Sequence, residues 1–365
     1  MNASNPEKAI LVGVKLNNRS GYNFESSLEE LKGLTEAAGG EVIATLVQAK
    51  DRPNSATYIG KGKLEELGHL AAELEPDLVI FDSELSPVQL RNLEQALDTR
   101  IIDRTMLILD IFGQRARSSE GILQVELARL EYSLPRLIGR GVEMSRIGGG
   151  IGARGAGEQK LELDKRHIRN RIKDIKKQMK KVESTRQLHR KQRLRAGLNT
   201  ISLIGYTNAG KSSLFNAMCR SAHRSGSGQV AADARLFQTL DTTTRKIILP
   251  SSREILITDT VGFIQNLPHH LVAAFRSTLE EAIDAGMLLH VVDVSDPDYF
   301  EKIEVVEKVL LGLGADMNNI LTVYNKADLL ELIPDGAIAG LFVSATTGTG
   351  IQNMLNLIDE RFLSQ

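Results

Sequence analysis

The stretch NTISLIGYTNAGKSSLFNAM, residues 199–218, decides the fold class of this chain. Its apolar start predicts a strand that ends at Gly205, and SLFNAM predicts a helix. Between the two, GYTNAGKS fits the phosphate-loop pattern G-x-x-x-x-G-K-[ST] in the context that this pattern requires. We therefore predict an α/β class P-loop domain over residues 198–365, with a mostly parallel sheet and helices on both faces.

The loop assigns a role to each of its parts. Backbone N–H groups at the start of a helix can cradle the α- and β-phosphates of a nucleotide, Lys211 would neutralise the β- and γ-phosphates, and the Ser212 hydroxyl would bind Mg²⁺. The residues expected to contact the nucleotide here are Gly205, Tyr206, Thr207, Asn208, Ala209, Gly210, Lys211, Ser212 and Ser213.

A second motif follows in EILITDTVGF, residues 254–263, where a predicted strand ends at Asp259. Asp259 is placed to hold Mg²⁺ through water, and the N–H of Gly262 can sense the γ-phosphate. The expected contact residues are Asp259, Thr260, Val261 and Gly262. Lys211 and Gly262 are therefore candidates for direct roles in phosphoryl transfer.

Two further motifs select guanine as the base. In NILTVYNKAD, Asn325, Lys326 and Asp328 follow a predicted strand, and the Asp328 carboxylate can accept hydrogen bonds from guanine N1–H and N2–H₂. Adenine offers no such pair, and a site built for one hydrogen-bonding pattern rejects the other strongly. In LFVSATTG, Ser344 and Ala345 follow another strand, and the Ala345 N–H could meet guanine O6. The four motifs together predict a GTP- and GDP-binding domain.

Phe263 follows Gly262, at a position where many small GTPases carry a glutamine that orients the attacking water. A phenyl ring cannot hydrogen-bond to water. We therefore expect slow intrinsic hydrolysis and an external surface that stimulates it.

The threonine that completes the Mg²⁺ shell lies in FQTLDTTTR, residues 237–245. Spacing alone leaves four candidates, which are Thr239, Thr242, Thr243 and Thr244.

Residues 104–197 predict an antiparallel helical hairpin. The first helix covers 104–137, with interruptions near Gly113 and Gly121, and the second covers 158–194. Apolar residues of the second helix recur at the alternating spacing of four and three that is typical of a coiled-coil seam, namely Ile168, Ile172, Ile175, Met179 and Val182. Residues 134–197 hold 19 Lys and Arg against 6 Asp and Glu, whereas the whole chain has a net charge of -1. This excess favours nucleic-acid binding over a self-paired helix surface.

The loop between the helices holds six glycines in residues 148–157. Gly150, Gly152 and Gly155 satisfy a dinucleotide pattern, but a strand does not precede them and a basic helix follows, so we reject that reading. We interpret the glycines as removing side chains so that the tip can approach RNA closely; a plain hinge is the alternative. The candidate RNA contacts are Arg136, Arg140, Arg146, Gly149, Gly150 and Arg154.

Residues 1–103 alternate strand and helix patterns and predict a small α/β domain with a parallel sheet. Ser26 and Ser86 are candidate helix N-caps, and GKGK, residues 60–63, is either a turn or an anion site. No apolar run is long enough to span a membrane, no signal peptide is evident, and the single cysteine fits a reducing compartment. We expect a cytoplasmic monomer.

The sequence resembles the HflX family of ribosome-associated translational GTPases over nearly its whole length. The resemblance is carried by YIGKGKLEEL (58–67), ELSPVQLRNLE (84–94), the long run from IDRTMLILD to LEYSLPRL (102–137), and RIGGGIGARGAGEQKLELDKRHIRNRI (146–172). It continues through GYTNAGKS, LFQTLD, DTVGFI, NKAD and SA.

The resemblance implies binding to the large ribosomal subunit, with the hairpin tip near the peptidyl-transferase region, and GTP-dependent splitting or rescue of stalled or idle ribosomes under stress. It implies that Thr239 is the Mg²⁺-binding threonine, with Phe237, Gln238, Leu240 and Asp241 around the nucleotide, and that Asn208 matches an asparagine that binds K⁺ in some related GTPases. Two departures stand out. Thr242 replaces a proline common in the family, and the small domain that many members carry after the GTPase domain is not expected here.

Two other function classes remain open from the residues alone. One is an RNA-binding or RNA-remodelling GTPase without specificity for ribosomes. The other is a signalling GTPase that acts on a protein effector.

Overall fold

The computed structural model describes residues 6–17, 23–146, 156–195, 198–224, 236–237, 242–265, 283–330 and 340–363. The chain forms two compact units. One contains residues 1–114 and 122–179, and the other contains residues 115–121 and 180–365. Within the described residues, no helix combines the length and the apolar character needed to cross a membrane.

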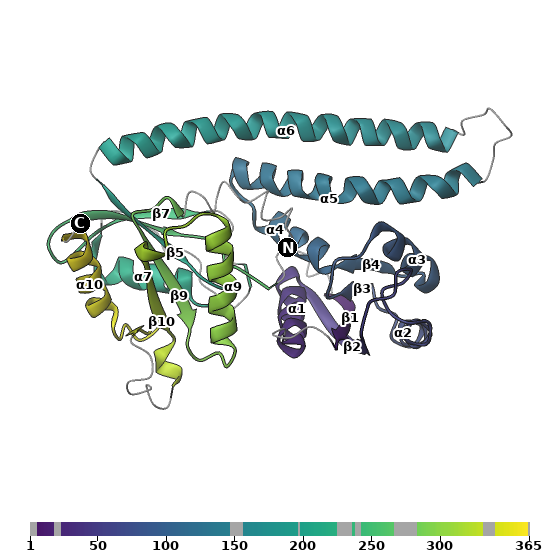
Figure 1. Ribbon diagram of the computed structural model, residues 1–365, viewed down its shortest axis with the longest axis horizontal. Helices are drawn as coiled ribbons and strands as arrows, with labels where there is room; N and C mark the ends of the chain where they lie inside the picture. The colour runs from purple at the N-terminus through teal and green to yellow at the C-terminus, as the bar shows by residue number, and fades with distance from the viewer. Residues whose placement is uncertain are drawn as a thin grey trace. The chain divides into compact units, whose positions relative to one another are not determined.

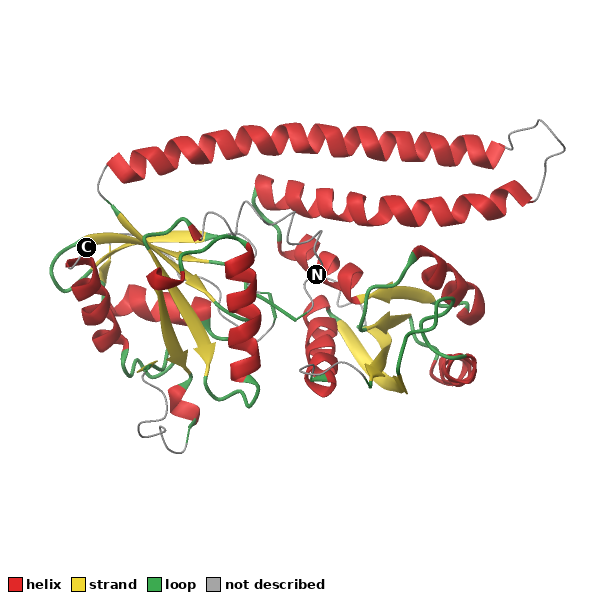
Figure 2. Ribbon diagram, viewed as in Figure 1, coloured by secondary structure: helices red, strands yellow, loops and turns green. Residues whose placement is uncertain are grey.

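The first unit begins with a four-stranded parallel sheet of order β2-β1-β3-β4 (Figures 1 and 2). Its elements are β1 (Glu7–Leu16), α1 (Phe24–Ala38), β2 (Gly40–Lys50), α2 (Lys61–Leu74), β3 (Leu78–Phe81), α3 (Pro87–Leu97) and β4 (Arg100–Asp103). Apolar side chains of the strands and of α2 and α3 form one core on a face of the sheet. The predicted α/β class is confirmed.

Local capping agrees with the sequence at one helix and differs at another. Ser86 caps α3 with a full capping box, as its hydroxyl accepts from Gln89 N and the Gln89 side chain accepts from Ser86 N. The predicted cap Ser26 is wrong, because α1 begins earlier and the Asn23 side chain accepts from Ser26 N at 3.2 Å. The Gly60 N–H of the GKGK segment donates to Gln48 Oε1 at 2.8 Å. This hydrogen bond favours a turn over an anion site at that segment.

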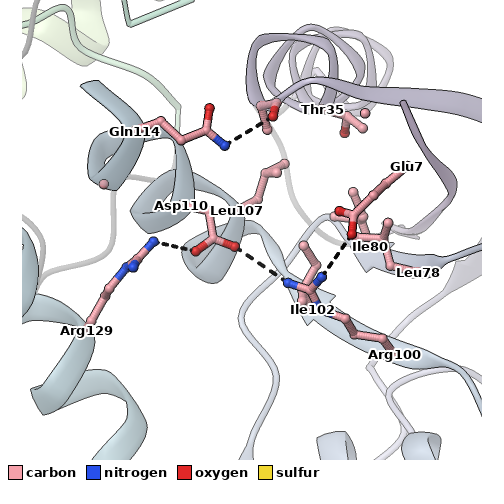
Figure 3. A pocket seen from close by; sticks show the side chains of 13 residues that line it. Glu7, Thr35, Leu78, Ile80, Arg100, Ile102, Leu107, Asp110, Gln114 and Arg129 are labelled. Carbon is pink, nitrogen blue, oxygen red and sulfur yellow. Dashed lines mark hydrogen bonds and ion pairs between the residues drawn. The ribbon is translucent and has the colours of Figure 1, made fainter. Parts of the chain in front are cut away.

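A pocket of about 400 Å³ opens at the amino ends of these strands (Figure 3). Leu78, Ile80, Ile102 and Leu107 supply its apolar lining. Its charged side chains pair with one another: Arg100 lies 3.5 Å from Glu7 and 3.9 Å from Asp110, and Arg129 lies 2.6 Å from Asp110. These ion pairs link β1 and β4 to the two helices that follow them.

Those helices are α4 (Arg104–Arg115) and α5 (Ser119–Arg146), and α6 (Ala156–Arg195) runs antiparallel to α5 (Figure 1). The predicted interruption falls at residues 116–118, between the two glycines named from the sequence. The predicted seam of α6 is at least half-buried throughout, and Ile175 is fully buried. Glu126 with Arg171 and Glu131 with Lys176 form ion pairs of 2.7 Å across the two helices.

The second unit holds a seven-stranded sheet of order β11-β10-β9-β5-β8-β7-β6, with parallel pairing from β11 through β8 and antiparallel pairing of β7. Its strands are β5 (Asn199–Ile204), β6 (His223–Arg224), β7 (Thr243–Ile248), β8 (Glu254–Asp259), β9 (Met287–Asp293), β10 (Ile320–Asn325) and β11 (Leu341–Phe342). The helices α7 (Lys211–Ser221) and α10 (Ile351–Leu363) pack on one core, and α9 (Tyr299–Gly312) packs on another. This is the predicted P-loop architecture.

Candidate nucleotide site

The four sequence motifs meet at one edge of the seven-stranded sheet. The loop 205–210 follows β5, Asp259 ends β8, Asn325 ends β10, and Ser344 comes shortly after β11. Because these strands are parallel, their carboxyl ends lie on the same edge, where open α/β sheets bind ligands. The structure thus brings together the described motif residues that the sequence places far apart.

The loop from Gly205 to Gly210 needs its two glycines. Gly205 has φ +146°, and a methyl group there would lie 2.2 Å from Val291 O. Gly210 has φ +88°, and a methyl group would lie 2.2 Å from Asn325 Nδ2. Asn208 between them is exposed and has φ +60°. The backbone therefore makes the tight turn that leads into the amino end of α7, where N–H groups favour an anion.

Lys211 is the first residue of α7, and its side chain folds back over the loop. Its Nζ donates to Gly205 O at 3.1 Å and to Tyr206 O at 2.7 Å, and the residue is buried. This burial lowers the pKa of Lys211 to about 8, an effect that nearby Asp259 opposes. The ammonium group is therefore charged at neutral pH but poorly solvated, and a phosphate would be a favourable partner.

Ser212 and Asp259 lie side by side at the place expected for Mg²⁺. The Ser212 hydroxyl donates to Asp259 Oδ2 at 2.6 Å, and Asp259 is fully buried. Thr260, the next residue, donates to Leu203 O at 2.6 Å and so fixes the end of β8 against β5. A hydroxyl and a carboxylate are hard oxygen ligands of the kind that Mg²⁺ prefers, so these residues fit the ion.

Phe263 holds the second motif against the phosphate loop. Its N–H donates to Gly205 O at 3.0 Å, and its carbonyl accepts from Thr207 N at 2.7 Å. The ring is buried in an apolar cluster with Tyr206, Leu288 and Val306. Phe263 therefore acts through its backbone and through packing, which sequence reasoning did not foresee. Its side chain offers no hydrogen bond to water, as expected.

Asn325 joins three motifs. Its Nδ2 donates to Ala209 O at 2.9 Å, and its Oδ1 accepts from Ala345 N at 3.1 Å. The Ala345 N–H, which we expect to meet guanine O6, donates to Asn325 Oδ1 in this structure. Ser344 is buried, and its hydroxyl accepts from Thr347 N, which shapes the turn after β11.

Lys326 and Asp328 flank the position expected for the base. Lys326 has φ +63°, and its Nζ lies 2.6 Å from Asp293 Oδ2 at the end of β9. Asp293 is not among the site residues predicted from the sequence, although its place at the carboxyl end of a central strand is a usable signal. Asp328 lies in a short 3₁₀ turn and its side chain is exposed. Asp293 therefore positions Lys326, and Asp328 is left accessible.

Comparison with known proteins identifies the family. Residues 25–113 match the family described as "GTP-binding GTPase N-terminal", residues 115–193 match "GTP-binding GTPase Middle Region", and residues 200–326 match "50S ribosome-binding GTPase". GTPase HflX of Caldanaerobacter subterraneus subsp. tengcongensis is 51% identical over 363 residues, which span 100% of this chain and 82% of that protein. GTPase HflX of Escherichia coli is 41% identical over 97% of this chain and 83% of its own length.

The chain belongs to the HflX family of GTPases. It is a P-loop GTP hydrolase that binds GTP and GDP. A solved GDP complex of a protein called SsGBP has the same fold, with a TM-score of 0.52 and 23% identity over 97% of this chain and 98% of that chain. The resemblance noted from the sequence is confirmed at the level of the family.

The switch segment of this HflX family member is described only in part. Phe237 is buried with φ +55°, whereas Gln238, Thr239, Leu240 and Asp241 lie outside the described residues. Two of the alternative threonines belong to β7, and Thr244 is hydrogen-bonded to Thr258 at 2.9 Å between the two hydroxyls.

Arg136 does not lie where an RNA contact was expected. Its side chain is 12% exposed, and its guanidinium lies 2.9 Å from Asp103 Oδ2 and also donates to Leu85 O at 2.8 Å. It stacks over the Tyr132 ring, whose hydroxyl donates to Asp103. This network ties α5 to the carboxyl end of β4, so the prediction for Arg136 is corrected to a structural role. Gly149, Gly150 and Arg154 lie outside the described residues, as do the side chains of Arg140 and Arg146.

His290 is expected to make the stability of this fold depend on pH. It is buried on β9, and burial, with a smaller effect of Lys211, lowers its pKa to about 4. Below pH 6.5 His290 binds a proton in the unfolded chain but stays neutral in the folded chain. The free energy of unfolding therefore falls as the pH drops from 6.5 towards 4. The loss at pH 5 is about 2 kcal/mol.

Urea unfolding of the wild type and of His290→Gln at pH 7 and pH 5 measures this effect. The wild type should lose more free energy of unfolding than the variant between the two pH values. Equal losses would show that His290 does not titrate as described.

Proposed function

We propose that this chain uses its nucleotide state to set its affinity for the large ribosomal subunit, and that it splits or rescues stalled or idle ribosomes under stress. GTP hydrolysis then resets the affinity. One observation carries the proposal, namely a basic face on α6. The description "50S ribosome-binding GTPase" of the family matched by residues 200–326 points to the same partner.

The basic face lies opposite the apolar seam of α6. Arg166, Lys173, Lys177, Lys180 and Lys181 are exposed and form no ion pair within the described part of the chain. With the seam at 168, 172, 175, 179 and 182, these five residues fall on the solvent-facing positions of the heptad repeat. Arg171 and Lys176, in contrast, pair with glutamates of α5. A continuous row of unpaired cations on a long helix suits the phosphate backbone of RNA.

The other parts of the proposal rest on the motifs and on the family resemblance. Mg²⁺ would be held by Ser212 and Thr239 directly and by Asp259 through water, and K⁺ by Asn208. The hairpin tip around Gly149 and Gly150, with Arg140, Arg146 and Arg154, would reach ribosomal RNA near the peptidyl-transferase region. We propose a cytoplasmic monomer divided into an N-terminal α/β domain (1–103), a hairpin (104–197) and a GTPase domain (198–365).

Co-sedimentation with purified large and small subunits tests the partner. The wild type should bind large subunits more tightly with a non-hydrolysable GTP analogue than with GDP. Equal affinity for any structured RNA would favour a general RNA-binding GTPase. Failure to bind in every nucleotide state would favour a signalling GTPase with a protein effector.

Replacing Lys173, Lys177 and Lys180 together by glutamate tests the basic face. Each lysine that contacts a phosphate adds about 1 to the slope of log Kd against log salt concentration, so the slope should fall by about 3. The matched control replaces the exposed Lys32, Lys61 and Lys308, which lie on α1, α2 and α9. If the variant and the control bind alike, the basic face does not contact the subunit.

A further inference from the structure

The hydroxyl of Thr207 lacks a hydrogen-bond partner in a place where one is expected. Thr207 is 7% exposed, and its Oγ1 is buried without a hydrogen bond to any described residue. Buried hydroxyls in folded proteins almost always have a partner, so an exception needs an explanation such as a missing ligand. Thr207 lies in the phosphate loop, next to the segment that ends in Phe263.

The side chain of Thr207 borders the space between Gly262 and Lys211. A methyl group on Gly262 would lie 2.8 Å from Thr207 Cγ2 and also 2.8 Å from Lys211 Nζ. In P-loop enzymes the lysine of the phosphate loop and the glycine of the motif after β8 both lie next to the terminal phosphate. The Thr207 side chain therefore stands beside the position where phosphoryl transfer takes place.

The backbone fixes Thr207 in this position. Its N–H donates to Phe263 O at 2.7 Å. The preceding residue, Tyr206, forms a parallel β-bridge with Phe263. Oγ1 and Cγ2 are attached to the same carbon, so a change of one staggered rotamer can bring Oγ1 to the position that Cγ2 now occupies. The hydroxyl can thus turn towards Gly262 without any movement of the main chain.

We propose that Thr207 is a catalytic residue of GTP hydrolysis, whose hydroxyl accepts a hydrogen bond from the attacking water and donates one to the γ-phosphate. The water oxygen forms a bond to the γ-phosphorus while the bond from that phosphorus to the β–γ bridging oxygen breaks. The electron pair of the broken bond leaves on GDP, and the water protons end on the released phosphate and the solvent. Thr207 is chemically unchanged at the end of the reaction. Its hydroxyl orients the attacking water in place of the glutamine side chain that many small GTPases carry at the position of Phe263.

Gln265 is a second candidate for orienting the attacking water. Its Oε1 is also buried without a partner within the described residues, but its N–H donates to the Tyr206 hydroxyl at 2.6 Å. The Tyr206 ring packs in the apolar cluster that holds Phe263. The Gln265 backbone is thus anchored to this apolar cluster, whereas the Cγ2 methyl of Thr207 lies beside Gly262.

Single-turnover hydrolysis of GTP by excess protein, without ribosomes, tests the proposal and does not depend on the ribosomal partner. Thr207→Val keeps the shape and removes the hydroxyl, so hydrolysis should slow roughly 10- to 100-fold. The affinities for GDP and for a non-hydrolysable GTP analogue should stay within about threefold, since backbone groups bind the phosphates. Thr207→Ser should restore the rate.

Thr35→Val is the matched control, because Thr35 is also buried but its hydroxyl donates to Leu31 O at 2.9 Å in α1. It should hydrolyse GTP at the wild-type rate. A wild-type rate in Thr207→Val would overturn the proposal, and so would a loss of GDP affinity that parallels the loss of rate. A loss of rate in Gln265→Ala with a normal rate in Thr207→Val would assign the water to Gln265 instead.

Discussion

Lys211→Ala is expected to abolish binding of guanine nucleotides at concentrations where the wild type is saturated. The ammonium group of Lys211 lies over the phosphate loop and donates to two of its carbonyls. We expect this group to donate to the β- and γ-phosphates when the nucleotide is bound. Hydrogen bonds to charged groups are worth about 1.5–3 kcal/mol each, so the loss of two such bonds should weaken binding roughly 100- to 10,000-fold. Equilibrium binding of fluorescent GDP and GTP measures the loss.

Thermal unfolding without nucleotide is the control for Lys211→Ala. Burial has already lowered the pKa of Lys211 to about 8, which means that the folded chain carries an unfavourable charge there at neutral pH. Removing this charge should not lower the unfolding temperature of the nucleotide-free protein. Retained GTP hydrolysis in a folded variant would contradict the assignment of the phosphate site.

Asp328→Asn is expected to exchange guanine specificity for xanthine specificity. We expect the Asp328 carboxylate to accept from guanine N1–H and N2–H₂, whereas an asparagine amide can accept from xanthine N1–H and donate to xanthine O2. Sites built to hydrogen-bond one substrate reject an analogue that leaves a polar group unpaired by about 10⁴-fold, so the preference should change by a factor of this order.

Competition of GDP and xanthosine diphosphate for one fluorescent nucleotide measures this exchange. Asn325 and Lys326 hold the turn that carries Asp328 through contacts with Ala209, Ala345 and Asp293. These contacts do not involve the Asp328 side chain, so the variant should keep its phosphate affinity. Unchanged preference for GDP would show that another group reads the base.

Motifs that are local in sequence were predicted well. The phosphate loop, Asp259, Gly262 and the Asn325 segment each follow a buried strand, and parallel pairing brings the ends of those strands together. The coiled-coil spacing of α6 likewise predicted which of its residues lie against a neighbour. Periodicity and motif spacing describe one helix or strand at a time. The nucleotide motifs and the seam of α6 each lie on one such element or at its end, so these patterns were sufficient to predict them.

Contacts between distant residues were not predictable in the same way. Arg136 pairs with Asp103, 33 residues earlier, and the excess of positive charge around Arg136 concealed this pairing. Asn325 accepts from Ala345 N, which no motif indicates. The partnerless hydroxyl of Thr207 is visible only when its surroundings are known, because the sequence gives a threonine no sign of whether its side chain has a partner.

We propose that the basic face of α6 couples a guanine-nucleotide switch to ribosomal RNA. GTP turnover by the wild type and by the Lys173, Lys177 and Lys180 glutamate variant, each with and without purified large subunits, tests it most directly. Large subunits should raise wild-type turnover roughly 10-fold or more, since a partner can supply what the active site lacks, and should leave the variant near its unstimulated rate. The same slow turnover of the wild type with and without large subunits would contradict this coupling.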